Sequence, residues 1–545
     1  MFRQKFSVFA LILMLLSPTL FHFPPEASAE NALDQAPELQ PYGIANGKRV
    51  LFDNTHGQTA GAADWVLDGA FSDFASALAN KGYYAKELRK NTSITYEDLK
   101  AYDVFIIGEA NIPYKSSEQA AMLQYVQDGG SIFFIGDHYN ADRNKNRWDA
   151  SEIFNGYRRG AYYDPAKGMG SEEASSSAMQ GVTGSDWLGD NFGVRFRYNA
   201  IGDVTANDIV APSQAFGITS GVGTVAMHAG STLAIMDPNK AKGVVYLPQT
   251  TAAWTHAVDQ GVYNGGGRAE GPYAAVSKVG LGKAAFIGDS SPVEDSTPKY
   301  LREETGGTKT TYDGFKEQND STLLVNLIDW LAKQENYTSL SQVSGLQLDQ
   351  PTDLLAMETP ETSTEPEAEP WSQPSAGYKW YDPSTFKSGS YGYDDGGTVG
   401  PATVDEDFES GTKGAYSAGN VSLSSGSWYF DNALLGNLSS DKKNGIQSAR
   451  VRSYGTLTMN FDVNGAKSVQ VSHANFGTDT GASWQLQMST NGGTSWTNVG
   501  SSNTSGSALA VKTFTLNLTS PVRFRIVVSG TSGKRLNFDD ILISN

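Results

Sequence analysis

The chain has 545 residues, with 41 Lys or Arg against 59 Asp or Glu, a formal net charge of −18 and no cysteine. The lack of cysteine excludes disulfides, thiolate metal sites and cysteine nucleophiles. The acidic balance disfavours binding of polyanions through a broad basic surface, whereas a local, metal-assisted contact with nucleic acid stays compatible with it.

The first residues have the pattern of an export signal. Arg3 and Lys5 precede a short apolar run, and Ala-Ser-Ala at 27–29 supplies the small residues that a signal peptidase needs. The run is too short and too rich in proline to span a bilayer. We therefore predict a signal peptide over 1–29, a leader over 30–47 and a secreted or wall-associated protein without a membrane span.

From residue 48 the chain alternates apolar strands with amphipathic helices. The predicted strands lie at 49–53, 83–88, 103–108, 131–137 and 283–289, and the predicted helices at 70–81, 116–127 and 322–333. Continuous apolar strands between helices are typical of a mostly parallel sheet with helices on both faces. We predict such an α/β domain over 48–335, with a long loop insertion at 141–280 that carries active-site loops and a few added strands.

The last third of the chain changes in composition. Proline with Glu, Thr and Ser dominates the predicted linker at 336–404, a composition typical of extended chain. Short alternating strands with Ser, Gly and Asn turns then follow, among them the hairpin signal at 491–493. This pattern predicts an all-β jelly roll or sandwich over 405–545.

Carboxylates follow the predicted parallel strands, at the sheet edge where ligands bind in open α/β folds. His56 and His138 come shortly after two of these strand ends. A mixed His/Asp set suits a divalent ion of the Mg, Mn or Zn type. The predicted metal ligands are Asp53, His56, Asp137, His138, Asp142 and Asp289.

Four further residues complete the predicted site. His228 or His256 would act as general acid or base, and Arg147 with Arg158 would hold a phosphate. A structural alternative stands beside each assignment, because a strand-end Asp often caps a helix or ties a turn and a lone His often serves as a hydrogen-bonded core residue. Among the predicted residues, the pair His56 and His138 most favours a functional site over a structural role.

Two resemblances add to this interpretation. The segments "VLFDNTHGQ", "LKAYDVFIIGEANIPYKSSEQAAMLQYVQDGGSIFFIGDH" and "AAFIGDSSP" resemble the class I glutamine-amidotransferase-like superfamily, in particular its GIFT-type branch. That resemblance implies the α/β fold, while the missing cysteine excludes amidotransferase chemistry. The segments "DFESGTKGAYSAGNVSLSSGSWYFDNALLG", "GTLTMNFDV" and "RLNFDDILI" resemble a jelly-roll accessory module of secreted bacterial endonucleases and other exported hydrolases.

Three functions are open on this basis. The leading hypothesis is a secreted metal-dependent hydrolase, a nuclease or phosphodiesterase acting on extracellular nucleic acid. The second is a non-catalytic surface protein that binds a glycan or another cell-surface ligand. The third is a carbohydrate-active hydrolase with two carboxylates, such as Asp137 with Glu109 or Asp142. Dependence on metal separates the first from the third, and turnover separates both from the second.

Overall fold

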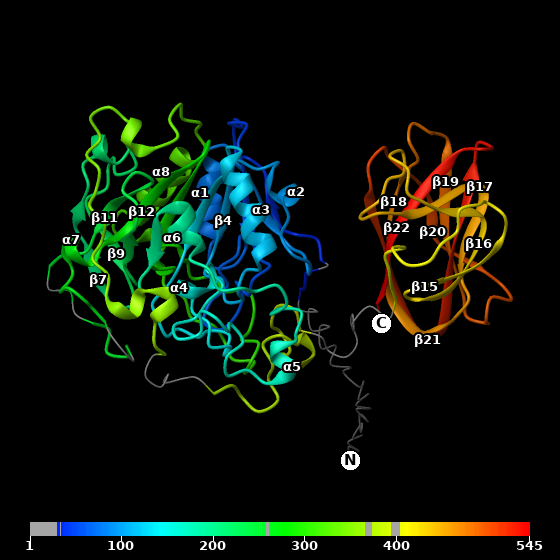
Figure 1. Cartoon of the computed structure of the whole chain (residues 1–545), viewed down its shortest axis with the longest axis horizontal. Helices are drawn as coiled ribbons and strands as arrows, with labels where there is room; N and C mark the ends of the chain where they lie inside the picture. The colour runs from blue at the N-terminus through cyan, green and yellow to red at the C-terminus, as the bar shows by residue number, and fades with distance from the viewer. Residues whose placement is uncertain are drawn as a thin grey trace, which may run out of the picture.

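The computed structural model describes residues 30–544 apart from 33, 250, 252, 258–260, 366–372 and 394–403, so the predicted signal peptide lies outside the described residues. Figure 1 shows an α/β body built from the N-terminal part of the chain and an all-β body built from its C-terminal part. Among the described residues, no helix has the length and apolar character needed to cross a membrane.

A nine-stranded sheet forms the centre of the α/β body. In spatial order its strands are β1 (Glu38–Leu39), β3 (Tyr84–Leu88), β2 (Arg49–Asp53), β4 (Val104–Ile107), β5 (Ser131–Ile135), β13 (Gly282–Ile287), β12 (Pro272–Val279), β11 (Ala241–Tyr246) and β8 (Asp208–Ile209). Strands β3, β2, β4, β5 and β13 are parallel. Strands β12, β11 and β8 extend the sheet in antiparallel fashion.

Helices cover both faces of the parallel part. The helices of this body are α1 (Ser72–Asn80), α2 (Tyr96–Leu99), α3 (Ser116–Gln127), α4 (Ala150–Ile153), α5 (Ser171–Ala174), α6 (Trp187–Phe192), α7 (Gly267–Glu270) and α8 (Asp320–Leu331). Ile106 of β4 packs in one core with residues of α1 and α8. Its neighbour Phe105 packs in a second core with Met122 of α3. Because successive strand residues point to opposite faces, the apolar run of β4 fills both cores.

The predicted insertion at 141–280 is refined, because its added strands extend the central sheet or pair with each other. Besides β8, β11 and β12, it contains two small antiparallel pairs, β6 (Val194–Phe196) with β10 (Leu233–Ile235) and β7 (Val204–Ala206) with β9 (Val225–Met227). All eight residues of β12 are buried. A tight turn at Gly280 joins β12 to β13, so the antiparallel strands cover the edge that β13 would otherwise expose.

The predicted linker at 336–404 is also corrected. Its described parts, 336–365 and 373–393, lie on the α/β body and are called the wrapping segment below. Leu340 is fully buried, and Tyr378 and Trp380 pack in the core beneath α3. Proline-rich composition predicts extended chain, but the apolar and aromatic residues spaced along this segment give it enough buried surface to dock.

The C-terminal body is an antiparallel sandwich. Its strands are β14 (Val404–Glu406), β15 (Gly419–Leu423), β16 (Gly426–Gly436), β17 (Ser448–Met459), β18 (Val463–Asn475), β19 (Ala482–Ser489), β20 (Thr497–Thr504), β21 (Ala510–Gly530) and β22 (Arg535–Ser544). Alternate residues, such as Trp428, Trp484 and Phe538, fill a core separate from those of the α/β body. The all-β domain predicted from the alternating sequence is therefore present.

Candidate functional site

Asp53 and His56 form a buried network after β2. The Asp53 carboxylate accepts hydrogen bonds from Thr55, from Gln58 Nε2 at 2.8 Å and from the Tyr114 hydroxyl at 2.7 Å. The His56 ring stacks on Tyr114 at 3.8 Å between ring centroids. Both oxygens of the Asp53 carboxylate therefore already accept hydrogen bonds from protein groups.

His56 also lies between two carboxylates. Its Nδ1 is 3.7 Å from Asp53 Oδ2 and its Nε2 is 3.2 Å from Glu118 Oε2. Burial opposes a charged ring, but the nearby charges of Glu118 and Asp53 outweigh it and raise the pKa of His56 to about 9. Burial would raise the pKa of Glu118 in turn, yet His56 and two backbone N–H groups lower it to about 2. The pair is therefore an imidazolium and a carboxylate at neutral pH.

Asp137 lies beside Glu109 after the neighbouring strands β5 and β4. Arg143 donates to both, at 2.5 Å to Asp137 Oδ2 and 3.1 Å to Glu109 Oε1. Burial and the adjacent Asp137 charge raise the pKa of Glu109 well above its usual value. Burial acts in the same direction on Asp137, but Arg143 and His138 hold its pKa below the usual value. Both carboxyls are buried, whereas the Arg143 side chain is 24% exposed in front of them.

The chain after Asp137 forms a strained, tightly bonded loop. Asn140, Asp142, Lys145 and Arg147 all have left-handed φ angles, between 37° and 69°. Asp149 holds the loop by accepting from the backbone N–H of Asn140 at 2.9 Å and of Asp142 at 2.7 Å. Strain of this kind persists only where surrounding contacts impose it, and it gathers at functional sites.

His138 is a buried, neutral ring. Its Nδ1 is 2.9 Å from the Tyr139 carbonyl, so Nδ1–H donates there and Nε2 faces Arg143 at 3.5 Å. Burial lowers its pKa. The ring lies 4.6 Å from that of Trp254. His138 therefore belongs to the same loop cluster as Arg143 and lies apart from the His56 network.

The remaining predicted residues have separate partners. Asp289 accepts from the N–H of His228 at 2.6 Å, and burial with the nearby Asp137 charge raises its pKa to about 7. The His228 ring pairs with Glu317 at 2.8 Å. His256 is exposed beside Trp254.

The two predicted phosphate-binding arginines do not converge either. Arg147 pairs with Glu173 at 3.1 Å. Arg158 is buried and donates to the Lys167 carbonyl at 2.5 Å. Since each guanidinium serves an internal contact of its own, the expected clamp does not form.

These residues, as arranged, do not fit a shared divalent metal. Within the described part of the chain, no group of three or more His, Asp or Glu side chains could hold one. The Asp53 carboxylate accepts from Gln58 and Tyr114, and Asp142 accepts from the backbone N–H groups of Asn146 and Arg147. Because these carboxylates already serve protein donors, no step is assigned to a metal.

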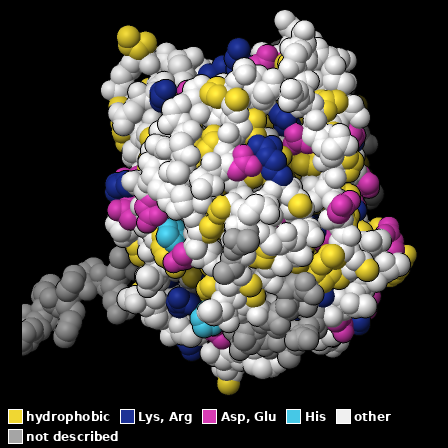
Figure 2. All heavy atoms as spheres, turned by 90° about the vertical axis from the view of Figure 1, so that its left-hand side faces the viewer, with side chains coloured by type: hydrophobic (Ala, Val, Ile, Leu, Met, Phe, Trp, Pro, Cys, Tyr) yellow, Lys and Arg dark blue, Asp and Glu magenta, His cyan; other side chains and the backbone are white. Residues whose placement is uncertain are grey.

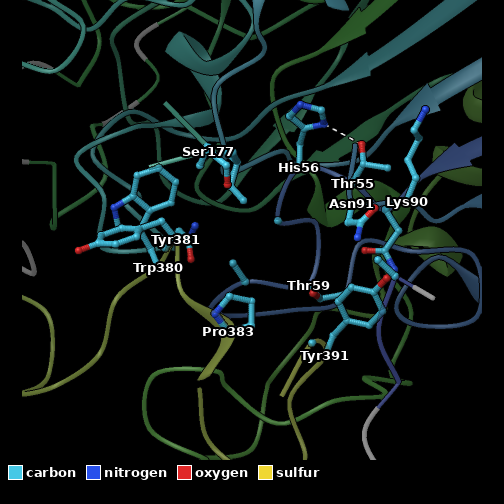
Figure 3. A pocket seen from close by; sticks show the side chains of 18 of the residues that line it. Thr55, His56, Thr59, Lys90, Asn91, Ser177, Trp380, Tyr381, Pro383 and Tyr391 are labelled. Atoms are coloured by element: carbon cyan, nitrogen blue, oxygen red, sulfur yellow. Dashed lines mark hydrogen bonds between the residues drawn. The ribbon is translucent and has the colours of Figure 1, made fainter. Parts of the chain in front are cut away.

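An aromatic cleft lies instead at the carboxyl ends of β2 and β3. This cavity of about 420 Å³ is lined on its aromatic side by residues of the wrapping segment, namely Trp380, Tyr381, Phe386, Tyr391 and Tyr393. Polar side chains complete it, among them Asn54, Thr55, His56, Lys90, Asn91 and Ser177. Figure 3 shows Trp380, Tyr381 and Ser177 on one side of the cavity and Tyr391, Asn91 and Lys90 on the other.

One residue of the cleft lining has a polar atom without a partner among the described residues. The Tyr391 hydroxyl oxygen is buried and makes no hydrogen bond with the described residues. Its ring is held at 5.3 Å from that of Tyr300 and 5.6 Å from the Arg89 guanidinium. A buried hydroxyl without a partner is costly, and a ligand group can remove that cost.

A second, smaller cavity adjoins the aromatic cleft, and we call it the cationic cavity. It has a volume of about 240 Å³ and is lined by Gly61, Ala62, His138, Ala141, Arg143, Lys145, Trp254, Arg302, Glu303 and Glu304. Glu303 lines both cavities, and Asn144 of the aromatic cleft lies between two residues of the cationic cavity. The two cavities are therefore neighbours along the same loops.

Sequence reasoning located the sheet edge and missed the aromatic wall. His56 and Arg143 follow strand ends, where ligands are expected. Trp380, Tyr381 and Tyr391 stand in the segment taken as linker. The signal that could have found them is their density, since five large aromatic residues within fourteen positions, 380–393, are unusual for a disordered linker.

The fold and these cavities define a protein of two folded bodies, in which the α/β body carries a cleft lined by aromatic and polar side chains. No protein-family model and no curated protein matches the sequence. Among solved structures, the chain is similar to the mmIFT52 N-terminal domain, with 14% identity, a TM-score of 0.33 and coverage of 53% of this chain and 99% of that one.

Two further similar structures are an adhesin domain and a carbohydrate-binding module. The K2 cleaved adhesin domain of Lys-gingipain has 18% identity and a TM-score of 0.22, covering 26% of this chain and 99% of that one. TmCBM61, solved with β-1,4-galactotriose, has 15% identity and a TM-score of 0.18, covering 21% of this chain and 86% of that one. At these values the likeness concerns parts of the fold alone.

Two expectations from the sequence are corrected at this point. The solved structures named above are an N-terminal domain, an adhesin domain and a carbohydrate-binding module rather than glutamine amidotransferases or endonucleases. No finding supports the likeness to those two groups, which is withdrawn. The interpretation as a metal-dependent nuclease, hydrolase or phosphodiesterase is withdrawn as well, because neither the metal ligands nor the phosphate clamp assembles among the described residues. Figure 2 shows both charge signs interspersed on the α7 and β11 side, without a broad basic patch on that face.

Proposed function

We propose that this protein is a secreted, non-catalytic glycan-binding protein whose ligand occupies the aromatic cleft. The observation that carries the proposal is the composition of the cleft wall, with Trp380, Tyr381 and Tyr391 around a set of amide, hydroxyl and amine groups. Sugar rings present apolar C–H faces and a rim of hydroxyls. Rigid aromatic rings supply contact area for the first, and the polar side chains supply hydrogen bonds for the second.

The carboxyl groups near the cleft favour binding over hydrolysis. Glycosidases need two carboxyls that reach the sugar from either side, about 5 to 9.5 Å apart. Glu109 and Asp137 lie against each other behind Arg143. Glu118 is held by His56 and by the backbone N–H groups of Ile94 and Lys115. No acid and base pair is thus free to act on a glycosidic bond among these residues.

The Tyr391 hydroxyl provides the sharpest test of this proposal. Because it has no partner within the described protein, Tyr391→Phe should leave the free energy of unfolding unchanged or slightly raised. It should weaken glycan binding by roughly fivefold, the value of one neutral hydrogen bond. A glycan array would first identify a ligand of the mature protein, and titration calorimetry would then compare the variants.

Two controls make the outcome clear. Tyr163 is 80% exposed and lies outside the cleft lining, so Tyr163→Phe should bind as the unmodified protein does. Tyr381→Ala removes a ring from the cleft wall and should cost more affinity than Tyr391→Phe. If the unmodified protein and the three variants all bound with the same affinity, the ligand would bind outside this cleft. New reducing ends appearing during the titration would contradict a non-catalytic role.

A further inference from the structure

Three cationic side chains converge on the cationic cavity of a strongly acidic protein. Arg143, Lys145 and Arg302 all line it, while the chain as a whole carries a net charge of −18. Neither Lys145 nor Arg302 forms an ion pair with any described residue, and Arg302 uses only Nε to reach the Thr308 carbonyl at 3.3 Å. Glu303 and Glu304 also line the cavity, and Arg143 is paired with Glu109 and Asp137, so Lys145 and Arg302 are the lining cations that remain for an anionic ligand.

Arg143 is presented rigidly to this cavity. Its Nε donates to Glu109 and its Nη2 to Asp137, while Nη1 makes no hydrogen bond with the described residues. The two buried carboxyls thus fix the plane of the guanidinium and leave one edge free. A planar guanidinium with a free edge is suited to a carboxylate or a sulfate.

The strained loop places Lys145 beside Arg143. Lys145 has a φ of 57°, and the backbone around it is held by Asp142, which accepts from Asn146 at 2.8 Å and Arg147 at 2.9 Å. A left-handed φ is uncommon for a residue other than glycine and persists where the surrounding contacts impose it. The carboxylates in the lining have other partners, since Glu303 accepts from the Gly61 N–H at 2.9 Å and Glu304 from Ser375 at 2.6 Å.

The cationic cavity and the aromatic cleft can hold parts of one ligand. Glu303 belongs to both linings, and the loops that line the cleft at Ala60 and Asn144 continue into the cavity at Gly61 and Lys145. The two cavities therefore share a wall at Glu303 and are lined by the same two loops.

We propose that the glycan is acidic, and that Arg143, Lys145 and Arg302 bind a carboxylate or sulfate on the sugar next to the one held in the aromatic cleft. This inference rests on the proposed function, because it names the class of ligand for the same site. It assigns the aromatic cleft to the apolar faces of the sugars and the cationic cavity to the charge that separates acidic from neutral glycans.

The test compares three probes on the full mature protein by titration calorimetry. These are an oligosaccharide of galacturonic acid, its carboxyl-reduced neutral counterpart and a sulfated counterpart. We expect an acidic form to bind at least tenfold more tightly than the neutral one, with an advantage that shrinks as NaCl is raised. The sulfated probe shows which anion the cavity prefers, and tighter binding of either one supports the proposal.

Variants then locate the effect. Lys145→Gln and Arg302→Gln should each reduce the ratio of the affinities for the acidic and neutral probes about fivefold. The double variant should bind both probes equally, with its affinity for the neutral probe unchanged. Lys100→Gln, at an exposed site outside both linings, is the matched control. An acidic preference that survives the double variant would overturn the assignment.

Two other results bear on the two proposals differently. Equal binding of acidic and neutral probes through Tyr381 and Tyr391 would refute the acidic ligand and leave the glycan-binding function standing. No binding of any glycan would refute both. Circular dichroism of each variant would confirm that the α/β body is folded in every case.

Discussion

His56 shows how a residue that suggests a metal ligand can serve as a structural cation. It is buried between Asp53 and Glu118 and stacks on Tyr114, so one side of the cleft is fixed by an ion pair. A buried pair of this kind contributes mainly by holding geometry, because the attraction between its charges is offset by their desolvation. The protonation of His56 therefore controls how firmly the cleft wall is held.

The pKa of His56 predicts a loss of stability in mildly alkaline solution. Its folded pKa of about 9 exceeds the ordinary value of 6.5, so the folded state binds this proton more tightly than the unfolded state does. The stabilisation is complete below pH 6.5 and is lost as the pH rises through 9, for a total of about 3 kcal/mol. Urea unfolding of the α/β body at pH 6, 7.5 and 9 measures it.

The His56→Gln variant is the control for this titration. It keeps a hydrogen-bonding side chain without a titrating ring, so its free energy of unfolding should change much less between pH 6.5 and 9. An unmodified protein with the same small pH dependence as this variant would mean that His56 is neutral in the folded state.

At the level of elements, the wrapping segment is held to the α/β body by a buried ion pair. Arg197 follows β6 and is fully buried, and it donates to both Glu358 oxygens at 2.8 and 2.7 Å. The same guanidinium donates to the carbonyls of Glu270 and Asp353. Three of these four hydrogen bonds join Arg197 to the wrapping segment, and the fourth joins it to the end of α7.

Removal of the Glu358 charge should release this part of the segment. Glu358→Gln leaves the Arg197 guanidinium buried without a carboxylate, which costs about 3–5 kcal/mol. We expect a lower free energy of unfolding and faster proteolysis near residue 358. Glu361 is exposed, so Glu361→Gln should change neither measurement. Equal proteolysis of the two variants would show that the segment is held mainly by its aromatic residues.

At the scale of the whole molecule, the wrapping segment is part of the α/β body rather than a tether. Tyr378 and Trp380 lie in the core beneath α3, and Lys242 pairs with Asp349 at 2.7 Å. The C-terminal sandwich has a core of its own. The boundary between the two folded units therefore falls after the wrapping segment and not before it.

Two truncations test this boundary. A protein of residues 30–393 should keep the stability of the α/β body and its glycan binding. A protein of residues 30–335, which composition alone would suggest, loses the two buried aromatic side chains and the aromatic wall of the cleft. It should be less stable by several kcal/mol, at about 3–5 kcal/mol for each large aromatic removed from a core, and should not bind. Thermal unfolding of both proteins decides between them, and equal melting temperatures would contradict the assignment.

The accuracy of prediction differed among these features for physical reasons. The strands at 49–53 and 131–135 and the helix at 116–127 were found because their patterns are local. The sequence indicated a few added strands within 141–280 but not their bounds, because most of them are short and separated by irregular chain. The charged state of His56 could not be read from sequence, since Glu118, which sets it, stands on a different element.

The sequence by itself determined that the protein has an α/β body and an all-β body, that it lacks thiol chemistry, and that polar residues gather at one sheet edge. These features follow from local periodicity and composition. Only the tertiary structure decided which of those residues meet. Trp380 and Tyr391 line one cleft with His56 because the wrapping segment buries enough apolar surface to dock, and burial of that kind depends on contacts between residues far apart along the chain.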